Sequence, residues 1–167
     1  FQKTIERRKK FPLDRIVLSK SLEQQNVGFN VSDKTNQNIQ NLKSDNCFTV
    51  TTGHQLNLFT GPLYFLYKIV SVINLSKELK GKYPKNDFVP IYWMATEDHD
   101  FEEVNHFKLF KKRYQLSNTK KGAVGHLKLE DVDELLLELK EDLGDRDGVD
   151  DILSLFSKFY SSSNTYA

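Results

Sequence analysis

The feature that most constrains the fold is a strand, helix, strand pattern between residues 47 and 95. Residues 47–52 are β-branched and aromatic and end at a glycine, which is typical of a buried strand. Residues 63–79 carry apolar side chains at helical spacing, between a Thr-Gly-Pro start and Gly81. Residues 88–95 form a second apolar run. This order predicts a βαβ unit with two parallel strands and a right-handed crossover.

The flanking segments predict further elements around this unit. Residues 1–46 are polar and rich in Asn and Gln, with short stretches of helical spacing, so we expect a helical arm packed on a larger core. Within it, one helix is expected to begin at Pro12, with Asp14 in its first turn, and another at a cap formed by Asp33. Basic and glycine-containing runs in residues 111–129 predict a hairpin or a short strand pair.

The composition excludes several classes of function. The 24 basic and 23 acidic residues leave a net charge of +1, which argues against a nucleic-acid partner. The apolar stretches are interrupted by polar residues, so no membrane span is predicted. Cys47 is the only cysteine, which excludes an internal disulfide and a multi-thiolate zinc site and favours a cytoplasmic location. Because the chain opens at Phe1 and its one methionine is Met94, we expect a fragment. We expect this fragment to be inactive alone, since half of a dinucleotide-type crevice is missing.

The first polar loop follows the first strand. Ligands of open α/β sheets bind beyond the carboxyl ends of the strands, where residues 52–55 and 60–62 are placed. The helix start at Gly61 would offer free N–H groups to an anion, and His54 would act as an acid or base. The alternative is that His54 and Gln55 only complete a tight turn. The loop matches neither a Walker motif nor GxGxxG.

The second polar loop follows the second strand and is dense in charge. Within residues 97–106 it holds the carboxylates Glu97, Asp98, Asp100, Glu102 and Glu103 and the imidazoles His99 and His106. A cation, a substrate ammonium group or a neighbouring Lys or Arg is expected to offset this charge. On a helix the two histidines would lie two turns apart, too far for one ion, so no metal ligands are assigned. Alternatively, Asp100 and Glu102 cap a helix and Glu103 faces water.

Both loops lie in long motifs that resemble one known family. Residues 51–68 read Thr-Thr-Gly-His-Gln-Leu-Asn-Leu-Phe-Thr-Gly-Pro-Leu-Tyr-Phe-Leu-Tyr-Lys. Residues 89–106 read Val-Pro-Ile-Tyr-Trp-Met-Ala-Thr-Glu-Asp-His-Asp-Phe-Glu-Glu-Val-Asn-His. These motifs resemble the signature of the BshC family, the cysteine-adding enzymes of bacillithiol biosynthesis. Weaker similarity covers the rest of the chain, which looks like the N-terminal portion of the much longer family members.

The resemblance implies an α/β fold with an incomplete Rossmann-like parallel sheet, related to nucleotidylyltransferases, over residues 47–167. The implied reaction is ligation of cysteine to the amine of glucosaminyl malate, with formation of an amide bond. The implied cofactor is ATP or another nucleotide or activated donor, and the metal is unspecified. The full-length parent is expected to be a homodimer through a downstream coiled coil. Residues 59–62 lack the His-x-Gly-His signature of related nucleotidyltransferases, which argues against direct ATP adenylation there.

The resemblance also implies roles for individual residues. The residues assigned to catalysis are His54, Asp98 and His99. The residues assigned to substrate or nucleotide binding are Thr52, Gly53, Gln55, Gly61, Tyr64, Lys68, Glu97, Asp100 and Asn105. Residues 52–68 would supply an anion-facing wall, and residues 97–105 an opposite wall facing the amine or amino acid across a shared hollow. Trp93 is expected in the core, and Cys47 is rejected as a nucleophile.

Two other functions stay open from the sequence. One is a different nucleotidylyltransferase-like enzyme on the same core. The other is a non-catalytic acidic module that binds a metal or a protein partner.

Overall fold

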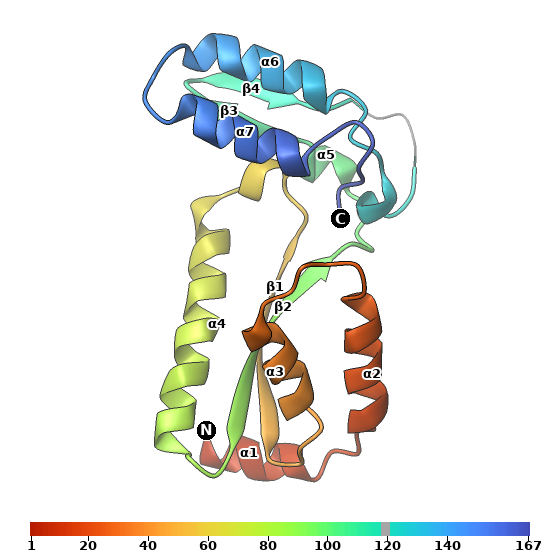
Figure 1. Ribbon diagram of the computed structural model, residues 1–167, viewed down its shortest axis with the longest axis vertical. Helices are drawn as coiled ribbons and strands as arrows, with labels where there is room; N and C mark the ends of the chain where they lie inside the picture. Colours follow the sequence, from red (N-terminus) through yellow and green to blue (C-terminus); the bar gives the residue numbers. More distant parts are fainter. Residues whose placement is uncertain (118–120) are drawn as a thin grey trace. The chain divides into compact units, whose positions relative to one another are not determined.

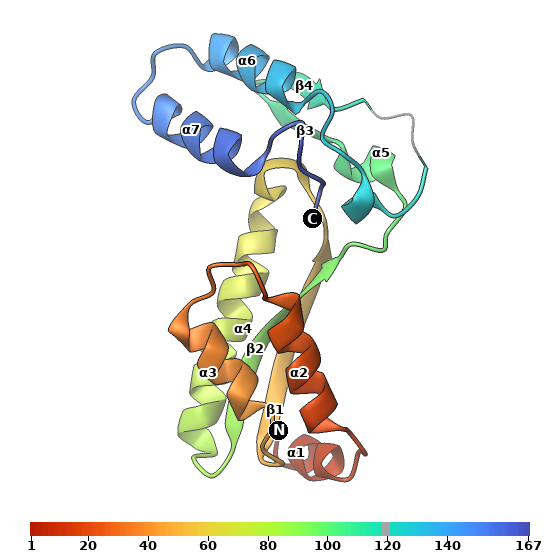
Figure 2. The same cartoon turned by 45° about the vertical axis from the view of Figure 1, so that its right-hand side comes forward.

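A computed structural model describes residues 1–117 and 121–167, which form two compact units (Figures 1 and 2). The first unit comprises residues 1–52 and 68–92, and the second comprises residues 53–67 and 93–167. Each unit is described by itself. The predicted arm, residues 1–46, belongs to the first unit, and its proposed boundary at residue 46 stays a prediction.

The helices and strands follow one another as labelled in Figure 1. In chain order they are α1 (Gln2–Lys9), α2 (Arg15–Gln25), α3 (Asp33–Asn41), β1 (Cys47–Gln55), the 3-10 helix η1 (Leu58–Thr60), α4 (Leu63–Lys82), β2 (Asp87–Ala95), α5 (Phe101–Val104), β3 (His106–Leu109), β4 (Lys112–Gln115), the 3-10 helix η2 (Val124–His126), α6 (Val132–Leu143) and α7 (Val149–Phe159).

Polar side chains set the starts of α2 and α3. Asp14 is the N-cap of α2, where its carboxylate accepts a hydrogen bond from the Val17 N–H at 2.9 Å. Ser32 caps α3 in the same way, 3.2 Å from the Thr35 nitrogen. The first helix therefore begins at Arg15 and not at Pro12, and the second is capped by Ser32, one residue before the predicted Asp33. In each case the side chain that accepts the first free N–H fixes where the helix begins.

The βαβ prediction is confirmed for the first unit. β1 and β2 are neighbours in a two-stranded sheet and run in the same direction (Figure 1). A buried cluster of Leu42, Cys47 and Val89 joins the two strands to the segment after α3. The chain is thus a mixed α/β protein with a small parallel sheet and flanking helices.

Two predicted boundaries in this region were wrong. Residues 53–55 continue β1 and do not form a turn, because the strand keeps its extended backbone through Gly53. A side chain at Gly53 would lie 3.1 Å from the Trp93 carbonyl oxygen, so glycine permits the close approach there. α4 also continues past Gly81 to Lys82.

The second unit has its own apolar core beneath a hairpin and two helices. β3 pairs with β4 in antiparallel register, with His106 opposite Gln115 and Leu109 opposite Lys112. The predicted strand pair was wrong in its partner: residues 112–115 pair with β3, and the run at residues 122–129 contains η2 and no part of the hairpin. The core residues are Leu56, Leu58, Phe59, Val104, Tyr114, Leu116, Val124, Leu129, Val132, Leu135, Leu136, Leu139, Val149, Leu153 and Tyr166.

None of the helices described for residues 1–117 and 121–167 has the length and apolar character needed to cross a lipid bilayer.

Candidate active site

Phe59 anchors the loop that follows β1 in the core of the second unit. Its ring stacks on Phe156 of α7, with 4.4 Å between ring centroids, and meets Tyr160 edge-on at 4.8 Å. Phe59 and Thr60 both have positive φ angles, 48° and 70°, which residues other than glycine rarely adopt. The aromatic packing holds this strained backbone, so the loop is built to keep one conformation.

His54 lies at the centre of a hydrogen-bonded group in this loop. Its Nδ1 is 2.9 Å from the Gln55 carbonyl oxygen, and its Nε2 is 2.5 Å from the Tyr64 hydroxyl. The Asn57 amide nitrogen lies 2.9 Å from both Nδ1 and the Gln55 oxygen. The Gln55 carbonyl favours a proton on Nδ1, whereas the Asn57 amide favours a bare Nδ1. The ring therefore has hydrogen-bond partners for either tautomer.

Gly61 has a structural role that differs from the predicted one. Its N–H donates to the Leu58 carbonyl at 3.1 Å, so that group is not free for an anion. Its backbone, with φ 63° and ψ −148°, is accessible almost only to glycine. A Cβ at this position would lie 2.6 Å from the Asn57 side chain. Gly61 therefore makes room for Asn57, which contacts His54.

The acidic loop after β2 is held by the backbone of η2. The Val124 N–H donates to the Asp98 carbonyl at 2.6 Å, and the Gly125 N–H donates to the Thr96 carbonyl at 3.0 Å. A Cβ on Gly125 would lie 2.6 Å from the Thr96 Cβ, so only glycine allows this approach. The backbone of η2 therefore holds the acidic loop in place, although η2 comes much later in the chain.

Gln55 joins the two polar loops. Its amide nitrogen donates to Asp98 Oδ2 at 2.6 Å and to Glu103 Oε2 at 3.0 Å. The Gln55 hydrogen bond, with a smaller contribution from the Asp100 N–H, lowers the pKa of the Asp98 carboxyl below its usual value. The two loops therefore lie close together, as predicted. A neutral amide, which was not among the groups expected to offset the acidic cluster, donates to two of its carboxylates.

Asp100 and Asn105 make mainly structural contacts. Asp100 caps α5 by accepting from the Glu103 N–H at 3.3 Å, as the structural alternative predicted, whereas Glu103 itself accepts from Gln55. Asn105 is 3% exposed, and its amide donates to the Leu116 carbonyl at 3.2 Å. Asn105 therefore connects the end of α5 to the segment that follows β4.

The two histidines of the acidic motif do not share a helix. His99 precedes α5, and His106 is the first residue of β3 with its Nδ1 3.2 Å from Asn105 Oδ1. The premise that they lie two helical turns apart was therefore wrong. Among residues 1–117 and 121–167, no group of three His, Cys, Asp or Glu side chains is arranged to hold a metal ion.

A cavity of about 650 Å³ opens beside part of the acidic loop. Its described lining includes His99, Asp100, Asn105 and Leu116, and it contains no residue of the β1 loop. The hollow expected between the two loops is thus not this cavity. His54 and His99 are brought to the same unit, but the contact between the loops runs through Gln55 and not through the imidazoles.

The remaining predicted residues are placed as follows. Glu97 is exposed on the loop after β2. Thr52 and Lys68 belong to the first unit, and their binding roles stay predictions. Trp93 is 60% exposed, so its predicted place in the core was wrong. Cys47 is 1% exposed, and its burial raises the pKa of its thiol to about 11, as expected for an inert structural cysteine.

Two residues that the structure brings into the site were missed from the sequence, and a third, Glu103, was named in the acidic loop without a binding role. Asn57 contacts His54, Glu103 accepts from Gln55, and Gly125 supports the acidic loop. Asn57 and Glu103 lie inside the two motifs, so the motifs themselves carried a signal. No motif indicated Gly125, because the need for glycine at this position arises from its contact with Thr96, which is distant in the sequence.

Parallel strands joined by a helix, with polar loops where each strand ends, define an α/β protein of the class that binds ligands at the carboxyl ends of its strands. All of residues 1–167 match the family described as "Bacillithiol biosynthesis BshC, N-terminal Rossmann-like domain". The chain therefore belongs to the BshC family and corresponds to its N-terminal Rossmann-like domain.

Individual relatives agree with this assignment. Proteins named "Putative cysteine ligase BshC" from Flavobacterium psychrophilum and Flavobacterium johnsoniae are 50% and 49% identical to the chain, each over 92% of its residues. A protein of the same name from Bacillus anthracis is 34% identical over 84% of the chain. The chain spans 29% of the length of the two Flavobacterium relatives and 28% of that of the Bacillus relative.

Proposed function

We propose that the full-length parent of this chain is a ligase that adds cysteine to the amine of glucosaminyl malate in bacillithiol biosynthesis. The chain contributes the wall of the active site that holds and deprotonates the amine. The observation that carries the proposal is the Gln55 amide between Asp98 and Glu103, because it joins the two motifs of the family into one polar site.

The contacts of Asp98 suit it to binding an ammonium group. Its carboxylate is charged near neutral pH, and a carboxylate of lowered pKa is a weak proton acceptor. Gln55 already donates a pair of N–H groups to Asp98 and Glu103, in the way that a substrate ammonium would. In the proposal, the amine of the sugar binds beside Gln55 and shares these carboxylates.

His54 is the better candidate for proton transfer. Imidazoles act as general bases near neutral pH, and both ring nitrogens of His54 have hydrogen-bond partners. The proposed step forms a C–N bond between the amine and the activated carbonyl carbon of cysteine, and the activating group leaves. Before the attack, the bound ammonium loses one proton to His54 through the Tyr64 hydroxyl, which frees the nitrogen lone pair. The second proton leaves the nitrogen with the activating group, and Asp98 stays ionised.

An amide bond in water requires an activated carboxylate, so a nucleotide or another activated donor is part of the proposal. The Gly61 N–H does not suit an anion, since it already bonds to Leu58. The acidic side chains nearby also favour a cationic partner over a phosphate. No step is therefore assigned to a nucleotide at this loop, and an external acyl donor is equally compatible with the residues.

Incubation of the full-length protein with cysteine, glucosaminyl malate and each candidate donor tests the proposal. Mass spectrometry should detect the cysteinyl amide for the wild type and for Asp133→Asn, which changes an exposed carboxylate on α6. Asp98→Asn should lower kcat/KM at least 100-fold. Absence of the amide with every donor would refute the ligase function. Nucleotide turnover without preference for the aminosugar would instead favour another nucleotidyl-transfer enzyme.

A further inference from the structure

Trp93 is an exposed aromatic residue near the carboxyl end of β2. Its side chain is 60% exposed, although it belongs to an apolar strand in which Val89 is 2% exposed. Aromatic side chains contribute most of their free energy through burial, either in a core or against a ligand or partner. They are also common in the walls of small-molecule sites, beside a few polar groups that orient the ligand. Trp93 therefore has the exposure of a ligand-contacting residue and not that of a core residue.

Gly53 places the indole on the face of the strands that carries Gln55. A Cβ at Gly53 would lie 3.1 Å from the Trp93 Cβ and 3.6 Å from its Cδ1, so the ring lies against the Gly53 backbone and both Cβ positions are on one face. Side chains two positions apart along a strand share a face, so Gln55 lies on the same face as Trp93. Gln55 is the residue whose amide donates to Asp98 and Glu103.

An indole beside two carboxylates suits a ligand that has both an ammonium group and an apolar ring face. Carboxylates bind an ammonium through charge-assisted hydrogen bonds. The face of an indole attracts a nearby cation and packs against C–H groups. An aminosugar offers both features, because one face of its ring presents C–H groups next to the amine. An acyclic amine offers only the ammonium group.

We propose that Trp93 is a specificity-determining residue that packs against the ring of an aminosugar while Asp98 and Glu103 hold its ammonium group. The inference rests on the proposed function, because it places the sugar where the ligase would bind the amine. Gly53, for which a binding role was predicted, then acts through Trp93: its missing side chain leaves room for the indole.

A segment of the parent protein is a less suitable partner for this indole. Asp98 is half-buried and Glu103 is exposed, so water hydrates both carboxylates. An apolar segment that covered Trp93 would remove part of this water, and the loss costs free energy unless a cation replaces it. A ligand with its own ammonium group supplies that cation.

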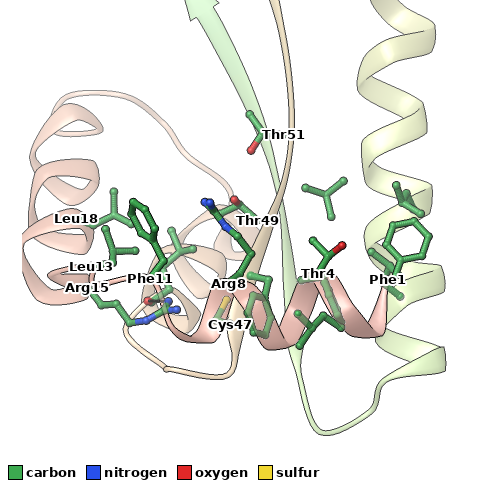
Figure 3. Close-up of a pocket in the computed structure, with 17 residues that line it drawn as sticks. Phe1, Thr4, Arg8, Phe11, Leu13, Arg15, Leu18, Cys47, Thr49 and Thr51 are labelled. Atoms are coloured by element: carbon green, nitrogen blue, oxygen red, sulfur yellow. Dashed lines mark hydrogen bonds between the residues drawn. The ribbon is translucent and has the colours of Figure 1, made fainter.

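The cavity of the first unit does not suit an aminosugar. It measures about 450 Å³, and its charged lining residues are Arg8 and Arg15, both labelled in Figure 3. The described lining contains no carboxylate, so an ammonium group would have no counter-ion there. The two guanidinium groups would also repel it. Charge therefore assigns the aminosugar to the acidic loop and Trp93.

Calorimetric titration of the full-length protein with glucosaminyl malate tests the inference without any turnover. Trp93→Ala should raise the Kd about 10-fold or more, whereas Trp93→Phe, which keeps an aromatic face, should raise it less than about 3-fold. Phe159→Ala is the matched control, because Phe159 is also 60% exposed, on α7 of the second unit. It should leave the Kd unchanged. Equal Kd values for wild type and Trp93→Ala, or no binding by the wild type, would overturn the inference.

Stability and turnover of the same variants separate the alternatives. If the parent protein covers the indole, Trp93→Ala lowers the denaturation midpoint and leaves the Kd unchanged, which overturns the inference. With an acyclic amine that carries the same malate group, Trp93→Ala should change kcat/KM less than about 2-fold, because no ring contacts the indole. Equal losses for the two amines would contradict a role in specificity. Binding that depends on Trp93, without amide formation from any donor, would refute the ligase function and support this inference.

Discussion

The side chain of Gln55, at the end of β1, donates a 2.6 Å hydrogen bond to Asp98, in the loop after β2. This bond connects residues 43 positions apart in the sequence and joins the two motifs that identify the family. It is also the largest of the influences that lower the pKa of Asp98. Gln55 therefore has both a structural and an electrostatic role.

Replacement of Gln55 by leucine should raise the pKa of Asp98 towards its usual value of 3.8, because the carboxylate loses its main donor. A carboxyl with a lowered pKa in the folded state contributes stability above pH 3.8, and this contribution disappears as the pH falls through the lowered value. The difference in denaturation midpoint between wild type and Gln55→Leu should therefore be present at pH 7 and shrink below pH 4.

Gln25→Leu is the matched control, since Gln25 is exposed at the end of α2. It should leave the pH dependence of stability unchanged. The pKa of Asp98 in Gln55→Leu can be measured from carboxyl carbon chemical shifts. If it equals the pKa in the wild type, the hydrogen bond from Gln55 is not the cause of the lowered value.

Gly61→Ala should disturb the His54 loop, whereas Gly81→Ala should not. Alanine at position 61 meets both a positive φ and a Cβ position 2.6 Å from Asn57, with a cost of about 1–3 kcal/mol for the strained backbone. Gly81 is the penultimate residue of α4 and has open space around it, so alanine should stabilise the helix, by less than the about 0.5–1 kcal/mol of a mid-helix position. Denaturation midpoints of the two full-length variants should move in opposite directions. Equal shifts would contradict the role assigned to Gly61.

The thiol of Cys47 should resist alkylation in the folded protein. Burial raises its pKa from 9.0 to about 11, so little thiolate forms at pH 8 and the sulfur is covered. Because the unfolded thiol ionises at lower pH, stability should fall as the pH rises from about 9 towards 11. Peptide mapping after iodoacetamide treatment should show modification of Cys47 only in denaturant. Rapid labelling of the native protein would place this residue at the surface.

Asn105→Ala should destabilise the full-length protein by about 1–3 kcal/mol, because the Leu116 carbonyl loses its donor in a buried region. Asn74→Ala, on an exposed position of α4, should change stability by less than about 0.5 kcal/mol. Urea denaturation of both variants measures the difference. If Asn105→Ala instead kept full stability and raised only the KM for substrate, the residue would belong to the binding site as the sequence analysis predicted.

The sequence predicted the elements well where local patterns decide them. Apolar spacing identified α4, and β-branched residues identified β1. The helix starts near Asp14 and Ser32 were displaced, because several residues in each segment can act as caps and only packing selects one. Gly53 was interpreted as the end of a strand, although the Trp93 backbone beside it explains the glycine equally well.

The candidate site was predicted in outline and not in its contacts. Two motifs after two strands were enough to expect that the loops meet, since parallel strands place their ends together. The sequence did not show that the Gly61 N–H is used by Leu58, or that Gln55 reaches Glu103. These contacts depend on side-chain direction and on residues far apart in the chain, neither of which leaves a periodic signal.

A double-mutant cycle between Gln55 and Asp98 tests the central claim most directly. The kcat/KM of the full-length protein for cysteinyl amide formation would be measured for wild type, Gln55→Leu, Asp98→Asn and the double variant. Residues in contact give non-additive effects, so the double variant should be no worse than Asp98→Asn alone. Losses that multiply in the double variant, or a Gln55→Leu protein with wild-type kcat/KM, would contradict the coupling of the two loops through this hydrogen bond.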